Sequence, residues 1–280
     1  MTSPARTRPY EGRTVTVGTL HGKERQFAPA FARWHGMTAR ATRALDTDLL
    51  GTFSGEVART LVPVAAATAK AVAATEESGS SLGLASEASY VSSAGGFGPV
   101  MHEEIAVFVD QERGTRVVET IRAFAAVPAP VTLREGVGIE AGLRRLGFPE
   151  NALIIRMPDG TLHKGITDRA AVEDLFAVAR SAGPMTLERD LRAHHNPSRQ
   201  RVLRRLAWVL AARLTTPCPA CRTPGFGRVA VIRGLPCAWC GEPTRRIIAD
   251  VHGCGLCDER VEVGRGNGRA DPGSCDQCNP

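Results

Sequence analysis

Eight cysteines provide the clearest chemistry in this 280-residue sequence, and all of them lie after residue 217. They form four C-x-x-C motifs. Two intervening residues let the chain wrap one metal ion, so each motif supplies half of a tetrahedral four-thiolate site. The spacing therefore predicts two structural zinc sites with no open coordination position, built from Cys218, Cys221, Cys237, Cys240, Cys254, Cys257, Cys275 and Cys278.

The spacing leaves the pairing of the four motifs open. Fifteen, thirteen and seventeen residues separate successive motifs. Sequential pairing, first with second and third with fourth, matches a common zinc pattern and is the arrangement we favour. A nested pairing (first with fourth) or an interleaved pairing fits the spacing nearly as well.

A second group of residues could bind phosphate. The stretch from Gly18 to Glu24 follows a β-branched run and precedes a helical pattern. Glycines let the backbone approach an anion, and the start of a helix offers unpaired N–H groups. Thr19, His21 and Lys23 are the side chains that we expect to contact it. An ordinary turn with a solvated lysine is the alternative interpretation.

Carboxylates and a basic segment could complete such a site. Glu56 ends an acidic loop and Glu87 lies near a strand end, where they could hold Mg²⁺ and position water as catalytic residues. Arg192, His194 and Arg199 fall in the string RAHHNPSR, and arginine forks suit phosphate. Helix capping by this string and solvated surface charge are the alternatives to binding.

The elements that must position these residues alternate between strand and helix patterns. Strands are predicted at 14–19, 37–45, 81–89, 152–157 and 162–166, with a hairpin of 104–110 and 115–125. Helices are predicted at 23–35, 57–77 (bent at Pro63), 135–146, 168–181 and 198–214. We expect an α/β fold with a mixed sheet, or an α+β fold, and a small zinc-ribbon-like module after it. The predicted divisions are a flexible tail (1–13), a mixed α/β domain (14–215) and a zinc-binding module with four knuckles (216–280).

Composition and charge exclude several classes of protein. With 43% hydrophobic and 23% charged residues, the chain is typical of soluble globular proteins. It has no apolar run long enough to span a membrane and no secretion-like start, so we expect a cytoplasmic protein without a membrane partner. Residues 216–280 carry eight arginines against seven acidic residues. Eight thiolates on two Zn²⁺ ions make that module about −3, which argues against nucleic acid as its partner.

Two resemblances accompany these patterns. Residues 14–90, with TLHGKE, GTFSGE and GLASEAS, are similar to house-cleaning pyrophosphatases that remove inosine or xanthosine triphosphate. That resemblance implies that Thr19 and Lys23 hold triphosphate, Glu56 binds Mg²⁺ and Glu87 assists the attack of water. Nearly the whole chain resembles a bacterial family of uncharacterised proteins with a domain of unknown function. That second resemblance rests on the strings HGKE, DTDLLGTFSGE, LGLASE, HKGI, RAHHNPSR, CPACRTPGFG and ADPGSCDQCNP.

Two functions are consistent with these residues. The first is a Mg²⁺-dependent hydrolase acting on a nucleotide or another small phosphate-bearing molecule, with the zinc module as structural support. The second is a non-enzymatic adaptor whose zinc knuckles present loops to a protein or nucleic-acid partner. The substrate, the oligomeric state and any coupling between the two domains lie beyond what the sequence indicates.

Overall fold

A computed structural model describes residues 8–45, 61–92, 100–135, 138–266 and 268–280. Its main body is a five-stranded sheet in the order β2-β1-β3-β4-β5. β1 pairs in parallel with β2 and β3, whereas β3, β4 and β5 pair antiparallel, so the predicted mixed sheet is confirmed. The elements are β1 (Thr14–Val17), α1 (Glu24–His35), β2 (Thr38–Ala41), α2 (Pro63–Ser78), β3 (Leu82–Ser92), β4 (Val100–Asp110) and β5 (Thr115–Ala125).

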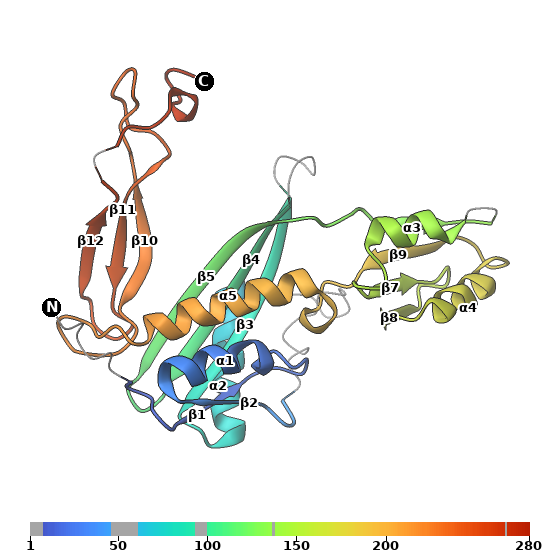
Figure 1. Ribbon diagram of the computed structural model, residues 1–280, viewed down its shortest axis with the longest axis horizontal. Helices are drawn as coiled ribbons and strands as arrows, with labels where there is room; N and C mark the ends of the chain where they lie inside the picture. Colours follow the sequence, from blue (N-terminus) through green and yellow to red (C-terminus); the bar gives the residue numbers. More distant parts are fainter. Residues whose placement is uncertain (1–7, 46–60, 93–99, 136–137, 267) are drawn as a thin grey trace.

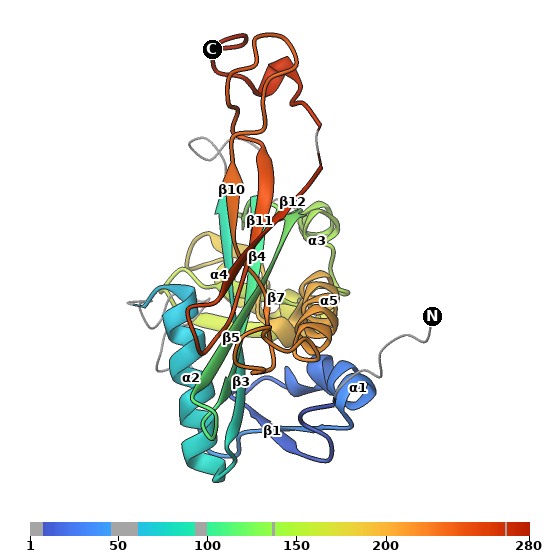
Figure 2. The same ribbon diagram turned by 90° about the vertical axis from the view of Figure 1, so that its left-hand side faces the viewer.

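Helices cover both faces of this sheet (Figure 1). Side chains alternate between the two faces of a strand, so Val15 and Val17 face one layer while Thr16 faces the other. Helix α1 and the long helix α5 (Pro197–Arg213) pack on the valine side, where Phe31 and Leu210 join the core. Helix α2 covers the opposite face, as Figure 2 shows. Asn196 caps α5 by accepting from the N–H of Arg199, which agrees with the capping alternative for the RAHHNPSR string.

Small residues let α2 approach the sheet closely. The helix contributes alanines to the interface, and a Cβ placed on Gly83 of β3 would lie 2.1 Å from the carbonyl oxygen of Ala71. A Cβ on Gly18 would lie 2.6 Å from the carbonyl oxygen of Lys70. Pro63 occupies the first turn of α2 and does not bend it, because an N–H is not needed there. Lys70 is thereby held beside the end of β1 and contacts Glu87 in the middle of β3.

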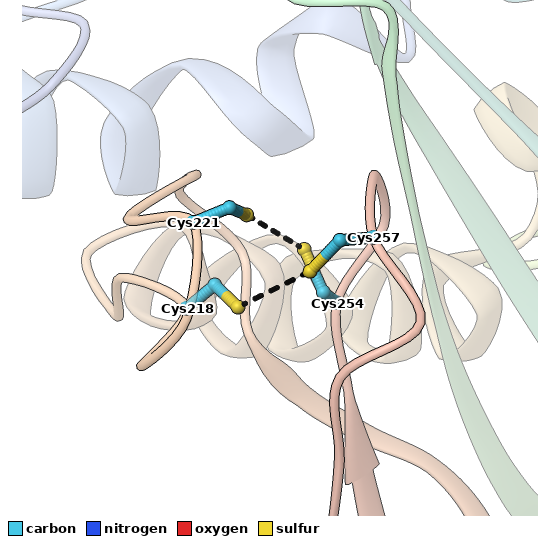
Figure 3. Close-up of side chains that lie close together, drawn as sticks. All are labelled: Cys218, Cys221, Cys254 and Cys257. Carbon is cyan, nitrogen blue, oxygen red and sulfur yellow. Dashed lines mark hydrogen bonds between the residues drawn. The ribbon is translucent and has the colours of Figure 1, made fainter.

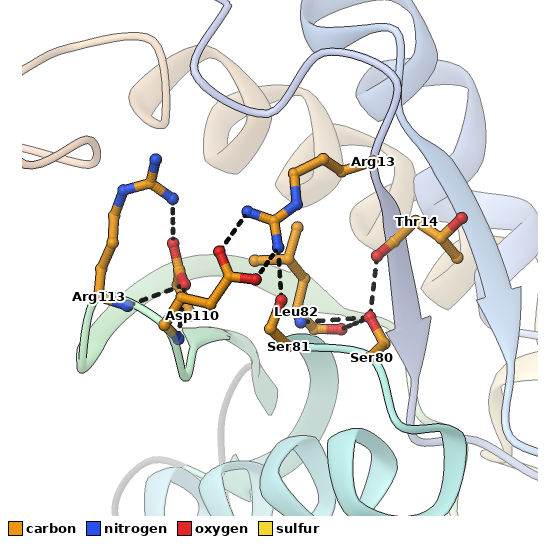
Figure 4. Close-up of polar contacts among 8 residues, drawn as sticks. Arg13, Thr14, Ser80, Ser81, Leu82, Asp110 and Arg113 are labelled. Carbon is orange, nitrogen blue, oxygen red and sulfur yellow. Dashed lines mark hydrogen bonds and ion pairs between the residues drawn. The ribbon is translucent and has the colours of Figure 1, made fainter.

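A polar network fixes the start of β1 (Figure 4). Arg13 donates to Ser81 Oγ at 2.5 Å and to Glu112 at 2.7 and 2.8 Å. Ser80 Oγ donates to the carbonyl oxygen of Thr14 at 3.0 Å. Tyr10, in the segment predicted as a flexible tail, is fully buried. The described part of that segment therefore packs against the fold.

Residues 131–189 build a second, antiparallel sheet in the order β6-β9-β7-β8, with a hydrophobic core of its own. Strands β7 and β8 and both helices were predicted from the sequence, and Asp168 caps α4 by accepting from the N–H of Ala170. Strands β6 and β9 were not predicted. The elements are β6 (Val131–Leu133), α3 (Ile139–Leu146), β7 (Leu153–Arg156), β8 (Leu162–Ile166), α4 (Arg169–Ala179) and β9 (Met185–Arg189).

The C-terminal residues 216–280 project from the body as an arm (Figure 1). The arm contains a three-stranded antiparallel sheet of β10 (Gly227–Arg233), β11 (Ile247–Gly253) and β12 (Arg260–Gly264). The described residues also form two short 3₁₀ helices, η2 (Ala193–His195) before α5 and η3 (Pro272–Ser274) near the C-terminus. None of the described helices is long and apolar enough to cross a bilayer.

Candidate functional site

The eight cysteines of the arm gather into two tetrads with interleaved pairing. The first C-x-x-C motif joins the third, and the second joins the fourth, so the sequential pairing favoured from the spacing is wrong. Figure 3 shows the first tetrad, in which the cysteines of the two motifs face one another. The tetrads are Cys218, Cys221, Cys254 and Cys257, and Cys237, Cys240, Cys275 and Cys278.

The strand register explains this pairing. Gly227 at the start of β10 pairs with Gly253 at the end of β11, which places the first motif beside the third. At the other end of the hairpin, Cys237 forms an isolated bridge with Ala270, which carries the last segment of the chain to the second motif. The antiparallel sheet thus separates the two tetrads to opposite ends of the arm.

The sulfur positions fit a tetrahedral ion. A Zn–S bond of about 2.3 Å places neighbouring sulfurs of a tetrahedron about 3.8 Å apart. The Sγ–Sγ contacts between motifs are 3.7 and 3.6 Å in the first tetrad and 3.9 and 3.6 Å in the second. A disulfide would require about 2.05 Å. Each tetrad could therefore hold one metal ion in a closed four-thiolate site.

The first tetrad lies against the outer edge of the main sheet. A Cβ on Gly255, between Cys254 and Cys257, would lie 2.5 Å from the carbonyl oxygen of Arg116 in β5. Arg213 at the end of α5 donates to the carbonyl oxygens of Val118 and Gly225 at 2.9 Å. The loops of the first tetrad and one arginine thus cover the first half of β5, which has no strand partner on that side among the residues that the structure describes.

A second candidate site lies in the body, where β1 ends between its two neighbours. After Val17 the chain turns into α1 and returns as β2, whereas β3 continues and returns as β4. Ligands of open α/β sheets bind at such points, where neighbouring strands lead to opposite sides. Five charged residues from β3, β4, α2, α5 and the β1–α1 connection lie together here. We call them the charge cluster: Lys23, Lys70, Glu87, Glu104 and Arg199.

Two cation–carboxylate pairs form most of the charge cluster. Arg199, 2% exposed, donates to both oxygens of Glu104 at 2.9 and 3.1 Å. Although burial raises the pKa of Glu104, the guanidinium, the hydrogen bond from His102 and the charge of Lys23 lower it to about 2. Lys70 forms a short contact with Glu87 Oε1 on the other face of β3. Breaking either pair would leave an uncompensated charge in the interior.

Lys23 makes the cluster unbalanced. Its ammonium group donates to the backbone carbonyl oxygen of Ser86 at 2.6 Å and pairs with no carboxylate among the described residues. Burial and the repulsion of Arg199 lower the pKa of Lys23 to about 8, against the opposing effect of Glu87 and Glu104. Within the described part of the chain, three cations thus face two carboxylates. Such a perturbed group at a sheet edge is typical of a functional site.

Lys70 and Glu104 were missing from the sequence-based prediction, although composition gave a signal for the lysine. The sequence contains three lysines among 35 basic residues, and two of the three are Lys23 and Lys70 in this cluster. The position of Glu104 in its strand also indicates that this carboxylate is buried. It falls on the face of β4 that carries Ala106 and Phe108, both fully buried, so its position predicts a buried carboxylate.

The remaining predicted residues fall around the cluster. Thr19 is buried, and its hydroxyl accepts from the N–H of His21 at 3.1 Å. The ring of His21 stacks on that of His194, with centroids 4.4 Å apart. Arg192 donates to both carboxylate oxygens of Asp190 at 2.7 to 3.1 Å and is thereby neutralised. Glu56 lies outside the described residues.

These features define the chain as a mixed α/β protein with a C-terminal module of two four-cysteine clusters, each of which could hold a metal ion. Residues 70–280 match the model of a family described as a domain of unknown function, DUF6671, and the chain belongs to this family. The predicted resemblance to a family with a domain of unknown function is therefore confirmed. The matched residues include Glu87, Glu104, Arg199 and both tetrads. No curated protein matches the chain in sequence.

Proposed function

We propose that this protein is a hydrolase of a small phosphate-bearing molecule, such as a nucleotide, that acts at the charge cluster. The observation that carries the proposal is the unbalanced charge of Lys23. A half-buried cation without a carboxylate partner is costly, and a substrate phosphate would supply the missing negative charge. Ser86 Oγ, beside the same contact, is buried and has no hydrogen-bond partner among the described residues. It could donate to that phosphate.

Mg²⁺ suits the proposed reaction, because it binds one or two carboxylates together with substrate phosphates. When bound, it would neutralise phosphate charge and polarise the bond that breaks. Glu87 and Glu56 are the carboxylates that we propose to hold it. Lys70 contacts Oε1 of Glu87 and would hold that carboxylate in place, and Lys23 would orient the phosphate. The two tetrads would bind zinc as structural ions, and their reduced cysteines suit a cytoplasmic location.

A substrate panel tests the proposal. Purified protein with Mg²⁺ is offered nucleoside triphosphates, diphosphates and sugar phosphates, and released phosphate or pyrophosphate is measured. We expect one class to be hydrolysed, and Lys23→Met and Glu87→Gln to reduce the rate by about 100-fold or more. Lys164→Met, in the second sheet, is the matched control and should retain the wild-type rate. Equal rates in all four proteins would refute the proposal.

The exposed tip of the arm favours a second function, an adaptor for a protein partner. Trp239 lies within the second C-x-x-C motif and is 78% exposed. Exposed tryptophans are enriched where protein interfaces form. Trp239→Ser should abolish binding of a purified partner while the zinc content stays at wild-type level. Unchanged affinity in this variant would exclude the arm tip as the contact.

A further inference from the structure

A small cationic pocket lies directly beside the charge cluster. It opens between the β1–α1 connection and the start of α5 and has a volume of about 170 Å³. Lys23 joins the two sites, since it lines the pocket while its ammonium group reaches Ser86 in the cluster. The lining residues are His21, Gly22, Lys23, Arg25, Gln26, Ala193, His194 and Gln200.

The charge of the lining selects for an anion. Lys23 and Arg25 contribute two positive charges to the lining, and no carboxylate is among the described residues that line the pocket. Glu24 lies next to the lining, with one carboxylate oxygen 3.7 Å from Arg25 Nε, so these three side chains carry a net charge of +1. The amide oxygen of Gln26 accepts from Arg204 at 3.0 Å, which leaves the amide nitrogen of Gln26 as the end that a ligand could use. The ammonium, guanidinium and amide N–H groups of the lining are donors, and a phosphoryl oxygen is an acceptor.

The size of the pocket limits the ligand. A water molecule occupies about 30 Å³ of liquid, so 170 Å³ corresponds to about five or six waters. A tetrahedral phosphoryl group with its oxygens fits this space, whereas a whole nucleotide would extend out of the opening. The pocket therefore suits a terminal phosphate and not an internal phosphodiester.

Two imidazoles make the pocket sensitive to the charge of its ligand. His194 stacks against His21 at 4.4 Å and lies 3.8 Å from the ring of His195, measured between centroids. Burial and the positive charges of His195, His21 and Arg192 lower the pKa of His194 to about 4, against a smaller opposing effect of Asp190. The ring is therefore neutral near pH 7. An anion beside it would raise its pKa, because it offsets those positive charges.

We propose that this pocket binds the terminal phosphoryl group of the substrate as a dianion and that His194 takes up a proton as the group binds. The inference rests on the proposed function, because it assigns the substrate class: a molecule that ends in a phosphate. For an anion whose own charge does not change with pH, binding should strengthen as the pH falls toward the raised pKa of His194. The protonated ring adds a positive charge beside Lys23 and Arg25, against the one negative charge of Glu24.

Calorimetry with inorganic phosphate and with sulfate tests the proposal on the full-length, metal-loaded protein. Sulfate is a dianion that does not titrate in this range, so proton uptake measured with it belongs to the protein. Titrations at pH 6 in two buffers of different ionisation enthalpy give the number of protons taken up. We expect the wild type to bind sulfate with uptake of a fraction of a proton. Phosphate should bind with a net release of protons, because it is mostly a monoanion at pH 6 and must lose a proton to bind as the dianion.

Four variants decide the outcome. Lys23→Met and Arg25→Glu should each weaken sulfate binding by about tenfold or more. Arg25 is exposed, so the second variant tests the pocket even if the first does not fold. His194→Gln should still bind but without proton uptake, whereas His163→Gln, in β8, should match the wild type. Sulfate affinity that is unchanged in Lys23→Met and Arg25→Glu, or proton uptake that persists in His194→Gln, would overturn the inference.

The same proteins separate this inference from the proposed function. If anion binding depends on Lys23 and Arg25 but no phosphate ester is hydrolysed, the anion-binding pocket is supported and the hydrolase function is refuted. If hydrolysis depends on Glu87 but the affinity for the anion is the same in the Arg25 and His194 variants, the hydrolase function is supported and the anion-binding pocket is refuted.

Discussion

The interleaved pairing of the cysteine motifs predicts a specific pattern of metal loss. In the structure, Cys218 and Cys254 serve the same tetrad, whereas Cys218 and Cys237 serve different ones. The double variant Cys218→Ser/Cys254→Ser should therefore keep one tightly bound ion. Cys218→Ser/Cys237→Ser should keep none, because each site is left with three thiolates and an open position.

The magnitude follows from the geometry and from the energy of such sites. Sulfurs 3.6 to 3.9 Å apart already match the edge of a ZnS₄ tetrahedron, so each complete tetrad binds without rearrangement. Structural zinc sites contribute about 10–16 kcal/mol of apparent binding free energy at pH 7. Loss of one thiolate should therefore weaken retention by several orders of magnitude, enough to be complete in dialysis against a moderate chelator.

Native mass spectrometry and elemental analysis after that dialysis read the result directly. The wild type should retain two ions per chain, and the two double variants should retain one and none, respectively. Sequential pairing gives the reverse order, and nested pairing gives none in both variants. Either of those patterns would refute the register argument that places the first motif beside the third.

Three further predictions concern the body. Gly83→Ala places a Cβ 2.1 Å from a carbonyl oxygen of α2, so the free energy of unfolding, measured by heat or urea, should fall by about 3 kcal/mol or more. Gly264→Ala is the control and should change it little, because a Cβ there has nothing within 4 Å. Glu104→Gln leaves the buried Arg199 without its counter-charge and should cost about 3–5 kcal/mol at pH 7. Because the pKa of Glu104 is lowered to about 2, the stability that its charge contributes is complete above about pH 4.5 and is lost as the pH falls toward 2. Urea unfolding of the wild type should therefore show a free energy of unfolding that falls with pH across this range, and the variant should lack this contribution. Lys23, with a pKa of about 8, should be about one-tenth neutral at pH 7, against about 0.04% for an ordinary lysine. Its labelling by an amine reagent, measured by mass spectrometry, should therefore have a midpoint near pH 8 and not near pH 10.

Local signals in the sequence predicted much of the fold. Helices were predicted to start at 168 and 198, and the structure places their caps at Asp168 and Asn196, where a side-chain oxygen satisfies a free N–H. The hairpin of β4 and β5 followed from two strand-like runs around Gly114. The strands of the arm were not predicted, because the whole segment was interpreted as metal-binding knuckles from its cysteine spacing. The sequence of β10, GRVAVIR, nevertheless contains the β-branched residues that are typical of strands.

Contacts between distant residues were beyond such signals. Arg199 lies 95 residues from Glu104, and the sequence offers no pattern that joins a helix start to the middle of a strand. Arg192 and Arg199 were predicted to hold phosphate, but each pairs with a carboxylate of the chain. The metal pairing likewise depends on which strand ends meet, and this is set by the register of β10 and β11 and not by loop length.

The contact between the first tetrad and β5 also concerns self-association. With the metal-site loops in place, the carbonyl groups near Arg116 and Val118 are shielded from any neighbouring chain. An open strand edge is a template for pairing with a second molecule. Removal of the ion from that tetrad would free its loops from the edge of β5. Metal-depleted protein should therefore oligomerise and precipitate, whereas metal-loaded protein should stay monodisperse.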